Sequence, residues 1–169
     1  CPFAKGPHAK GQIHYAVSLG DSRAQLLVLL RSELQALADA DPQQRETSLL
    51  VVPDQFADFL DFNDFLDEAE AELDALDLVG ELQIASFHPQ FQFAGTAAAD
   101  ISNATNRSPY PTLHLIREAS IDRAVEAFPE ADTIFEANIA TLQRLGATGW
   151  AALEVGPRGI QAQPPTAKS

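Results

Sequence analysis

The chain has 169 residues, 46% of them hydrophobic and ten of them phenylalanine, which predicts one globular domain with a sizeable core. Its formal charge of −13 at pH 7 argues against nucleic acid as a partner, because phosphates are bound by positive charge. No apolar run approaches the roughly 20 residues that span a bilayer. We therefore expect no membrane partner and a soluble, cytoplasmic protein, whose single cysteine forms no internal disulfide.

The negative charge is concentrated in the middle of the chain. Between Glu46 and Asn106 there are thirteen Asp and Glu residues and no Lys or Arg. The other 108 residues carry eleven acids and eleven bases, so the whole excess belongs to this segment. We expect an acidic surface there that keeps the protein soluble or repels anions.

The first two predicted elements are a strand and a helix. Residues 12–18 alternate apolar with polar or small side chains, which is typical of a half-buried strand. Leucines at helical spacing predict a helix over residues 22–40, with Asp21 or Ser22 as its N-cap. The helix is expected to end at Pro42.

A second strand–helix pair follows. The apolar run 48–52 predicts a buried inner strand. Apolar residues at steps of three and four predict a long amphipathic helix over residues 56–78. Its aspartates are three residues apart and no turn glycine accompanies them, so we interpret them as a solvated acidic face rather than a calcium loop.

The third strand is predicted at 82–87, with a short edge segment at 91–93 after Pro89. A helix is then predicted to begin at Ser108–Pro109, where proline suits the first turn, and to continue past Ser120 to Phe128.

The C-terminal part is predicted to contain one more helix and one more strand. Thr133 and Glu136 form a capping box that opens the last helix, which is expected to end at Gly146. Residues 150–155 are predicted to add a final strand, and residues 157–169 have the composition of a flexible tail.

These elements predict an α/β fold in a single small domain over residues 1–156. Alternating strands and helices imply a mostly parallel or mixed sheet packed by amphipathic helices. Ligand sites of such sheets gather at the carboxyl ends of the strands. This rule directs attention to His88, directly after the third strand.

Three side chains are candidate catalytic residues and metal ligands: His88, His114 and Glu118. On the predicted helix His114 and Glu118 lie four residues apart on one face. With His88 they would give two nitrogens and one carboxylate, a set that suits a divalent iron or zinc site. The alternative is a surface ion pair and a strand-end histidine, without any metal.

Substrate-binding candidates come from the same segment. Arg107 is the only base between Arg45 and Arg117, and beside Asn106 it could hold a carboxylate or phosphate. Alternatively, Arg107 pairs with an acid of the long helix and fastens the loop. Tyr110 lies between two prolines, and its hydroxyl could point into a cleft or its ring could fill the core.

Cys1 is a candidate nucleophile, but only with an activating base that the sequence does not place. The sequence contains no G-x-S-x-G, Walker loop, dinucleotide fingerprint or C-x-x-C, so four common chemistries lose support.

Four short motifs resemble those of a bacterial domain-of-unknown-function family, the 1415 family: CPFAK (1–5), ASFHP (85–89), NRSPYP (106–111) and HLIREAS (114–120). The resemblance extends from Cys1 to about Gly146. It implies a helical segment before the cysteine motif, and hence a start that lies upstream of Cys1. The family brings no established activity, but its motifs are rich in polar residues, which favours a functional site.

Two classes of function follow. The first is an enzyme, with a divalent metal as a candidate cofactor, acting on a small anionic metabolite at the segment 86–118. The second is a non-catalytic binding or interaction protein whose acidic helical face meets a basic partner and whose polar motifs only brace the loop.

Overall fold

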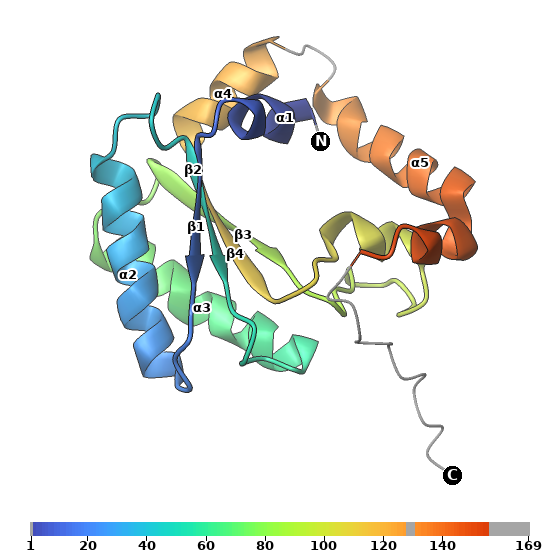
Figure 1. Cartoon of the computed structure of the whole chain (residues 1–169), viewed down its shortest axis with the longest axis horizontal. Helices are drawn as coiled ribbons and strands as arrows, with labels where there is room; N and C mark the ends of the chain where they lie inside the picture. Colours follow the sequence, from blue (N-terminus) through green and yellow to red (C-terminus); the bar gives the residue numbers. More distant parts are fainter. Residues whose placement is uncertain (1, 128–130, 156–169) are drawn as a thin grey trace.

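The computed structural model describes residues 2–127 and 131–155 and has one four-stranded sheet with the strand order β1-β2-β4-β3 (Figure 1). Its strands are β1 (Ile13–Val17), β2 (Thr47–Val51), β3 (Leu82–Phe87) and β4 (Thr112–Arg117). β1 and β2 are parallel, whereas β4 runs antiparallel to both β2 and β3. The predicted α/β fold with a mixed sheet is confirmed.

One face of the sheet, here called the packed face, is covered by α2 (Arg23–Asp39) and α3 (Phe59–Ala75) (Figure 1). The helices bury their apolar stripes against alternate residues of the strands, and all of these side chains are fully buried: Leu26, Leu30, Leu34 and Leu37 of α2, Phe62 and Phe65 of α3, Leu50 of β2, and Leu113 and Leu115 of β4. The leucine and phenylalanine spacing therefore predicted both helices correctly.

Polar residues begin these two helices. Ser22, in extended conformation, accepts a hydrogen bond from the backbone N–H of Gln25. Asp58 likewise accepts from Leu60 N and Asp61 N. Each cap satisfies amide groups that the first helical turn leaves without a partner. The starts of α2 and α3 follow from these caps.

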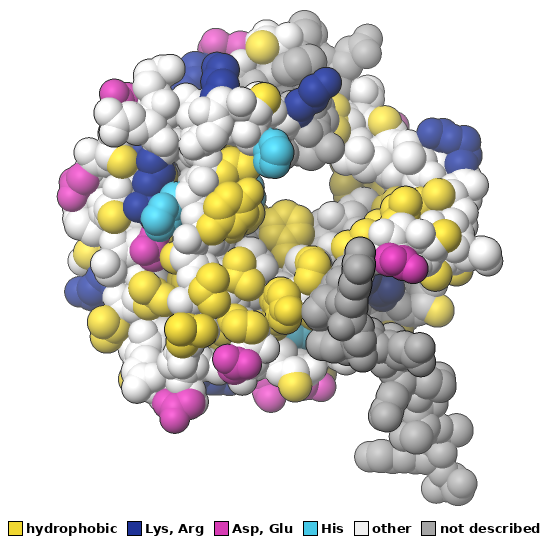
Figure 2. Space-filling model, viewed as in Figure 1, with side chains coloured by type: hydrophobic (Ala, Val, Ile, Leu, Met, Phe, Trp, Pro, Cys, Tyr) yellow, Lys and Arg dark blue, Asp and Glu magenta, His cyan; other side chains and the backbone are white. Residues whose placement is uncertain are grey.

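The opposite face of the sheet, here called the open face, carries Ile13, Tyr15 and Val17 of β1 and their neighbours across the strands, because successive strand residues point to opposite sides. Tyr15 and Val17 remain 57% and 51% exposed. Hydrophobic side chains gather on this side of the molecule, and an opening separates them from α5 (Ala131–Ala152) (Figure 2). Helix α5 packs on η1 (Ile101–Asn106) rather than on the strands.

The helix predicted from residue 108 to 128 is wrong over its first half. Residues 112–117 form β4, and of the described residues in this range only Glu118–Ala127 are helical, as α4. The segment has a period of two as well as a helical spacing: Leu113 and Leu115 are buried on the packed face, whereas His114 and Ile116 lie on the open face. Pairing with both β2 and β3 decides in favour of the strand.

The C-terminal predictions are also corrected. Gly146 does interrupt the helix, with φ 67° and ψ 174°, but a further helical stretch reaches Ala152, so no strand forms at 150–155. Residues 91–93 form no edge strand, because that segment belongs to the loop after β3. The predicted tail at 157–169 lies outside the described residues.

The N-terminal helix α1 (Pro2–Ala9) was not predicted. Within residues 2–127 and 131–155, no helix is both long enough and apolar enough to cross a membrane.

Candidate functional site

His114 lies at the centre of the open face. The register pairs it with Leu49 of β2 on one side and with Ala85 of β3 on the other. The Phe87 ring is tilted against the imidazole at a centroid distance of 6.2 Å. The histidine is thus half-buried among apolar neighbours on the side of the sheet that α2 and α3 do not cover.

A short hydrogen-bond chain sets the proton position on His114. The Thr47 hydroxyl donates to the carbonyl oxygen of Leu115 at 2.6 Å. Its oxygen lies 2.7 Å from Nε2 of His114. Because a hydroxyl has only one proton, Thr47 accepts from His114, and the ring is the Nε2–H tautomer. No side chain or backbone group of the described residues contacts Nδ1 through a hydrogen bond, which leaves its lone pair available.

Burial lowers the pKa of His114 to about 4. The imidazole is therefore neutral near pH 7 and presents one unprotonated nitrogen from a fixed ring. Such a group can accept a hydrogen bond or a proton from a ligand on the open face. The Thr47–Leu115 chain holds the ring in the orientation that this role needs.

His88 does not share this site. It is 1% exposed, on the packed face, where its ring stacks on Phe62 at 5.4 Å. Nε2 donates to the carbonyl of Phe56 at 2.8 Å, and Nδ1 accepts from Gln90 N at 3.0 Å. Both ring nitrogens are used, so His88 joins the loop after β3 to the segment before α3. Burial also lowers its pKa.

The predicted metal set of His88, His114 and Glu118 does not assemble. Glu118 begins α4, whereas His114 belongs to β4, so the two are not on one helix face. Glu118 instead lines a pocket of about 380 Å³ near β3, together with Glu70. Among the described residues, no three His, Cys, Asp or Glu side chains are grouped so that they could hold a metal ion.

Arg107 braces the loop between β3 and β4. Its NH2 group donates to the carbonyl of Ala98 at 2.7 Å, and Nε donates to that of Phe91 at 3.4 Å. Burial lowers the pKa of this guanidinium. These bonds support the part of the alternative in which Arg107 fastens the loop, with backbone carbonyls as partners instead of an acid of the long helix. Anion binding by Arg107 stays a prediction.

The neighbouring candidates also contribute to the loop. Asn106 donates from Nδ2 to Ser86 O at 3.4 Å, and its own carbonyl accepts from His88 N. The carbonyl of Tyr110 accepts from the hydroxyls of Ser108 and Thr112. Substrate binding by Asn106 and Tyr110 stays a prediction. Cys1 lies outside the described residues.

Sequence reasoning missed Thr47 and Asn103. Asn103 is fully buried, and its Oδ1 accepts from Phe93 N and the Thr96 hydroxyl, while Nδ2 donates to Ala97 O. Thr47 precedes the apolar run at 48–52, so period-two alternation places it on the face opposite Ser48. Only the pairing of β2 with β4 brings it to His114.

A family model described as a protein of unknown function, DUF1415, matches residues 1–152. Neither a curated protein nor a solved structure matches the chain.

Proposed function

Starting from the chain's membership of the DUF1415 family, we propose that it is an enzyme acting on a small anionic metabolite, which binds to the open face beside His114. The observation that supports this proposal is the free Nδ1 of a neutral, oriented histidine. His114 lies on the open face and uses only Nε2 in a hydrogen bond, whereas His88 uses both of its ring nitrogens.

The anionic character of the ligand gives His114 a catalytic role. With a pKa of about 4 the free ring is a weak base. A negative charge bound close to it favours the imidazolium and raises the pKa toward neutrality. The metabolite thereby prepares Nδ1 to accept a proton, while the Nε2–H donated to Thr47 holds the ring in place.

The apolar surroundings strengthen this coupling. Leu49, Ala85 and Phe87 flank the imidazole and exclude water from part of its surface. A charge–charge interaction is stronger in such an environment than in bulk water. We also place the activity in the cytoplasm, because a single cysteine is typical of a reducing compartment.

The test is a metabolite-depletion assay. Purified protein is incubated with a mixture of small organic acids and phosphates, and the mixture is followed by mass spectrometry. The wild type is expected to consume at least one anionic component, and His114→Gln, which fits the site but has a poor proton acceptor, to do so about 100-fold more slowly or less. Thr47→Val, which removes the hydroxyl, is expected to be intermediate.

His8→Gln serves as the matched control, because His8 is exposed on α1. Equal consumption by the wild type and His114→Gln would contradict the proposal. A component that binds without being consumed would instead favour the alternative, a non-catalytic binding protein.

A further inference from the structure

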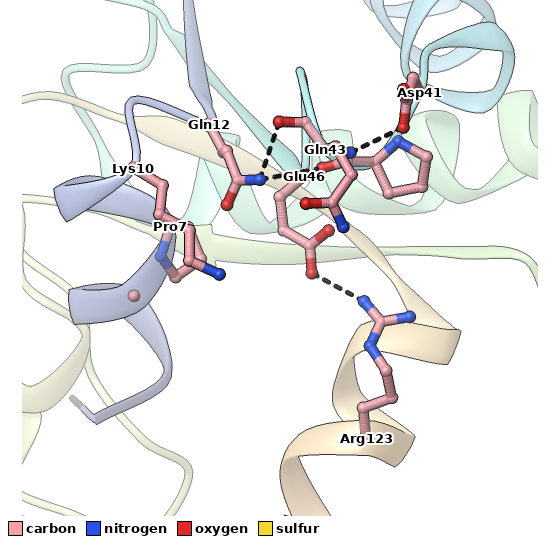
Figure 3. A pocket seen from close by; sticks show the side chains of 9 residues that line it. Pro7, Lys10, Gln12, Asp41, Gln43, Glu46 and Arg123 are labelled. Carbon is pink, nitrogen blue, oxygen red and sulfur yellow. Dashed lines mark hydrogen bonds and ion pairs between the residues drawn. The ribbon is translucent and has the colours of Figure 1, made fainter.

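A second candidate site lies at the far end of the sheet from the β3–β4 loop. A pocket of about 440 Å³ is enclosed by α1, by the segment before β2 and by α4 (Figure 3). Its charged lining consists of Lys10, Asp41, Glu46 and Arg123. Both signs of charge face one space whose volume is in the range of small-molecule sites.

Gln12 supplies a fixed acceptor to this pocket. The residue is 7% exposed, and its Nε2 donates to the carbonyls of Gln43 at 2.8 Å and Pro42 at 3.5 Å. These two bonds fix the orientation of the amide, so that Oε1 points the other way, into the pocket, between Lys10 and Glu46 (Figure 3). Oε1 accepts no hydrogen bond from the described residues.

The basic side chains that line the pocket, Lys10 and Arg123, have N–H groups without a hydrogen-bond partner among the described residues. The ammonium of Lys10 has no side-chain or backbone partner within the described ranges and projects into the pocket (Figure 3). Arg123 uses NH2 for both the Glu46 carboxylate and the Ser120 hydroxyl, each at 2.9 Å. NH1 and Nε of Arg123 remain without a described partner.

The acids also keep free oxygens. Glu46 meets Arg123 through Oε1 alone, and its side chain is 17% exposed. Asp41 uses Oδ1 to cap the turn at Gln43. Acceptors on the side of Gln12 and Glu46 thus face donors on Lys10 and Arg123.

We propose that this pocket binds a small zwitterion, a carboxylate that also carries an ammonium group, as free amino acids do. Its carboxylate is held by Lys10 and Arg123, and its ammonium by Gln12 Oε1 and Glu46. A simple anion would leave the Gln12 oxygen and the free oxygen of Glu46 without donors, and a simple cation would leave Lys10 without an acceptor. The site goes beyond the proposed function and shares none of its residues.

Glycine is the probe that tests this, because it carries both charges and little else. Its binding is followed by two-dimensional NMR on the full chain, beside acetate and methylamine, each of which carries only one of the charges. Glycine is expected to shift the amide signals of residues 10–12 and 43–46 and to bind at least about tenfold more tightly than either single-charge probe.

Lys10→Gln is expected to weaken glycine binding about tenfold or more, and Arg123→Gln is expected to act in the same direction. Lys5→Gln is the matched control, since Lys5 is exposed on α1, the helix that Lys10 follows, and does not line the pocket. Lys10 and Arg123 are exposed enough that both variants are expected to fold.

Acetate binding as tightly as glycine, unchanged glycine affinity in Lys10→Gln, or no shift up to about 100 mM glycine would each overturn the proposal. His114→Gln is expected to bind glycine like the wild type, which separates this site from the one on the open face.

Discussion

His88, directly after β3, and His114, in β4, use their ring nitrogens differently. Both ring nitrogens of His88 form hydrogen bonds with backbone groups, one at Phe56 and one at Gln90, and the ring packs between aromatic rings. His114 uses only Nε2, which donates a hydrogen bond to Thr47. The first arrangement stabilises the fold, whereas the second leaves Nδ1 without a hydrogen-bond partner among the described residues.

The lowered pKa of His114 makes stability depend on pH. Its folded-state pKa of about 4 lies below the ordinary value of 6.5, so the unfolded chain takes up the proton first as the pH falls. The free energy of unfolding therefore keeps its full value above pH 6.5 and decreases as the pH falls toward 4. The decrease due to His114 is at most about 3 kcal/mol, at 1.36 kcal/mol per pKa unit.

Urea unfolding at pH 7 and pH 4.5 measures this effect as the difference between the wild type and His114→Gln. The variant is expected to lose less stability between pH 7 and pH 4.5 than the wild type. Some loss remains in both proteins, because burial also lowers the pKa of His88. Identical pH dependence in the two proteins would contradict a neutral His114.

For His88 we predict a purely structural effect. His88→Phe keeps an aromatic ring but leaves the Phe56 carbonyl and the Gln90 N–H without their partner. The expected cost is about 1–3 kcal/mol of unfolding free energy in urea titration. The exposed His8→Phe should stay within about 0.5 kcal/mol of the wild type. Equal costs for the two variants would show that the hydrogen bonds of His88 contribute nothing.

At the scale of elements, much of the fold could be predicted from sequence. β1, α2 and α3 each have one clear periodicity and β2 is an apolar run, and these elements and β3 lie where the patterns indicated. β4 was missed because HLIRE carries a histidine and a glutamate at helical spacing inside an alternating segment. A local pattern cannot reveal that β4 fills the position between β2 and β3.

The site was less predictable than the fold. Its central contact joins Thr47 and His114, which are 67 positions apart in the chain. Only the register of β2 on β4 brings them together, and a shift of one residue would send His114 to the packed face. The contacts of Arg107 were unpredictable as well, since its partners are backbone carbonyls that no sequence pattern identifies.

The end of α2 depends on one side chain from β4. NH2 of Arg117 donates to the carbonyls of Leu37 and Ala40 at the end of α2 and to that of Arg45, and the Leu37 carbonyl also accepts from the backbone N–H of Ala40. Arg117→Met is therefore expected to cost about 1.5–3 kcal/mol, as judged by urea unfolding. Arg144→Met, at an exposed position of α5, is the control and should cost less than about 0.5 kcal/mol. Similar losses for both would mean that the carbonyls of α2 do not need Arg117.

At the scale of the whole molecule, the two faces of the sheet differ in how they are covered. The packed face holds the hydrophobic core, and the acids of α3 lie on its outer surface. The open face carries His114 among exposed apolar side chains. The buried apolar side chains thus gather on one side of the sheet, and the proposed ligand would bind on the other.

The acidic surface of α3 is expected to contribute charge and little stability. Asp61 and Asp64 are exposed. Reversing both to Lys should change the unfolding free energy by about 0.5 kcal/mol or less, measured by thermal or urea unfolding. Addition of calcium should not shift the melting temperature of the wild type. A loss of several kcal/mol in the double variant would point to a structural role for these carboxylates.

The most direct test of the account is the ring nitrogen NMR spectrum of His114, assigned by comparison with His114→Gln. Between pH 5.5 and 8 we predict a neutral ring with the proton on Nε2 and an unprotonated Nδ1. Addition of the metabolite found in the depletion assay should protonate Nδ1 or shift its signal strongly. A proton on Nδ1 in the free protein, or an imidazolium at pH 7, would contradict the account.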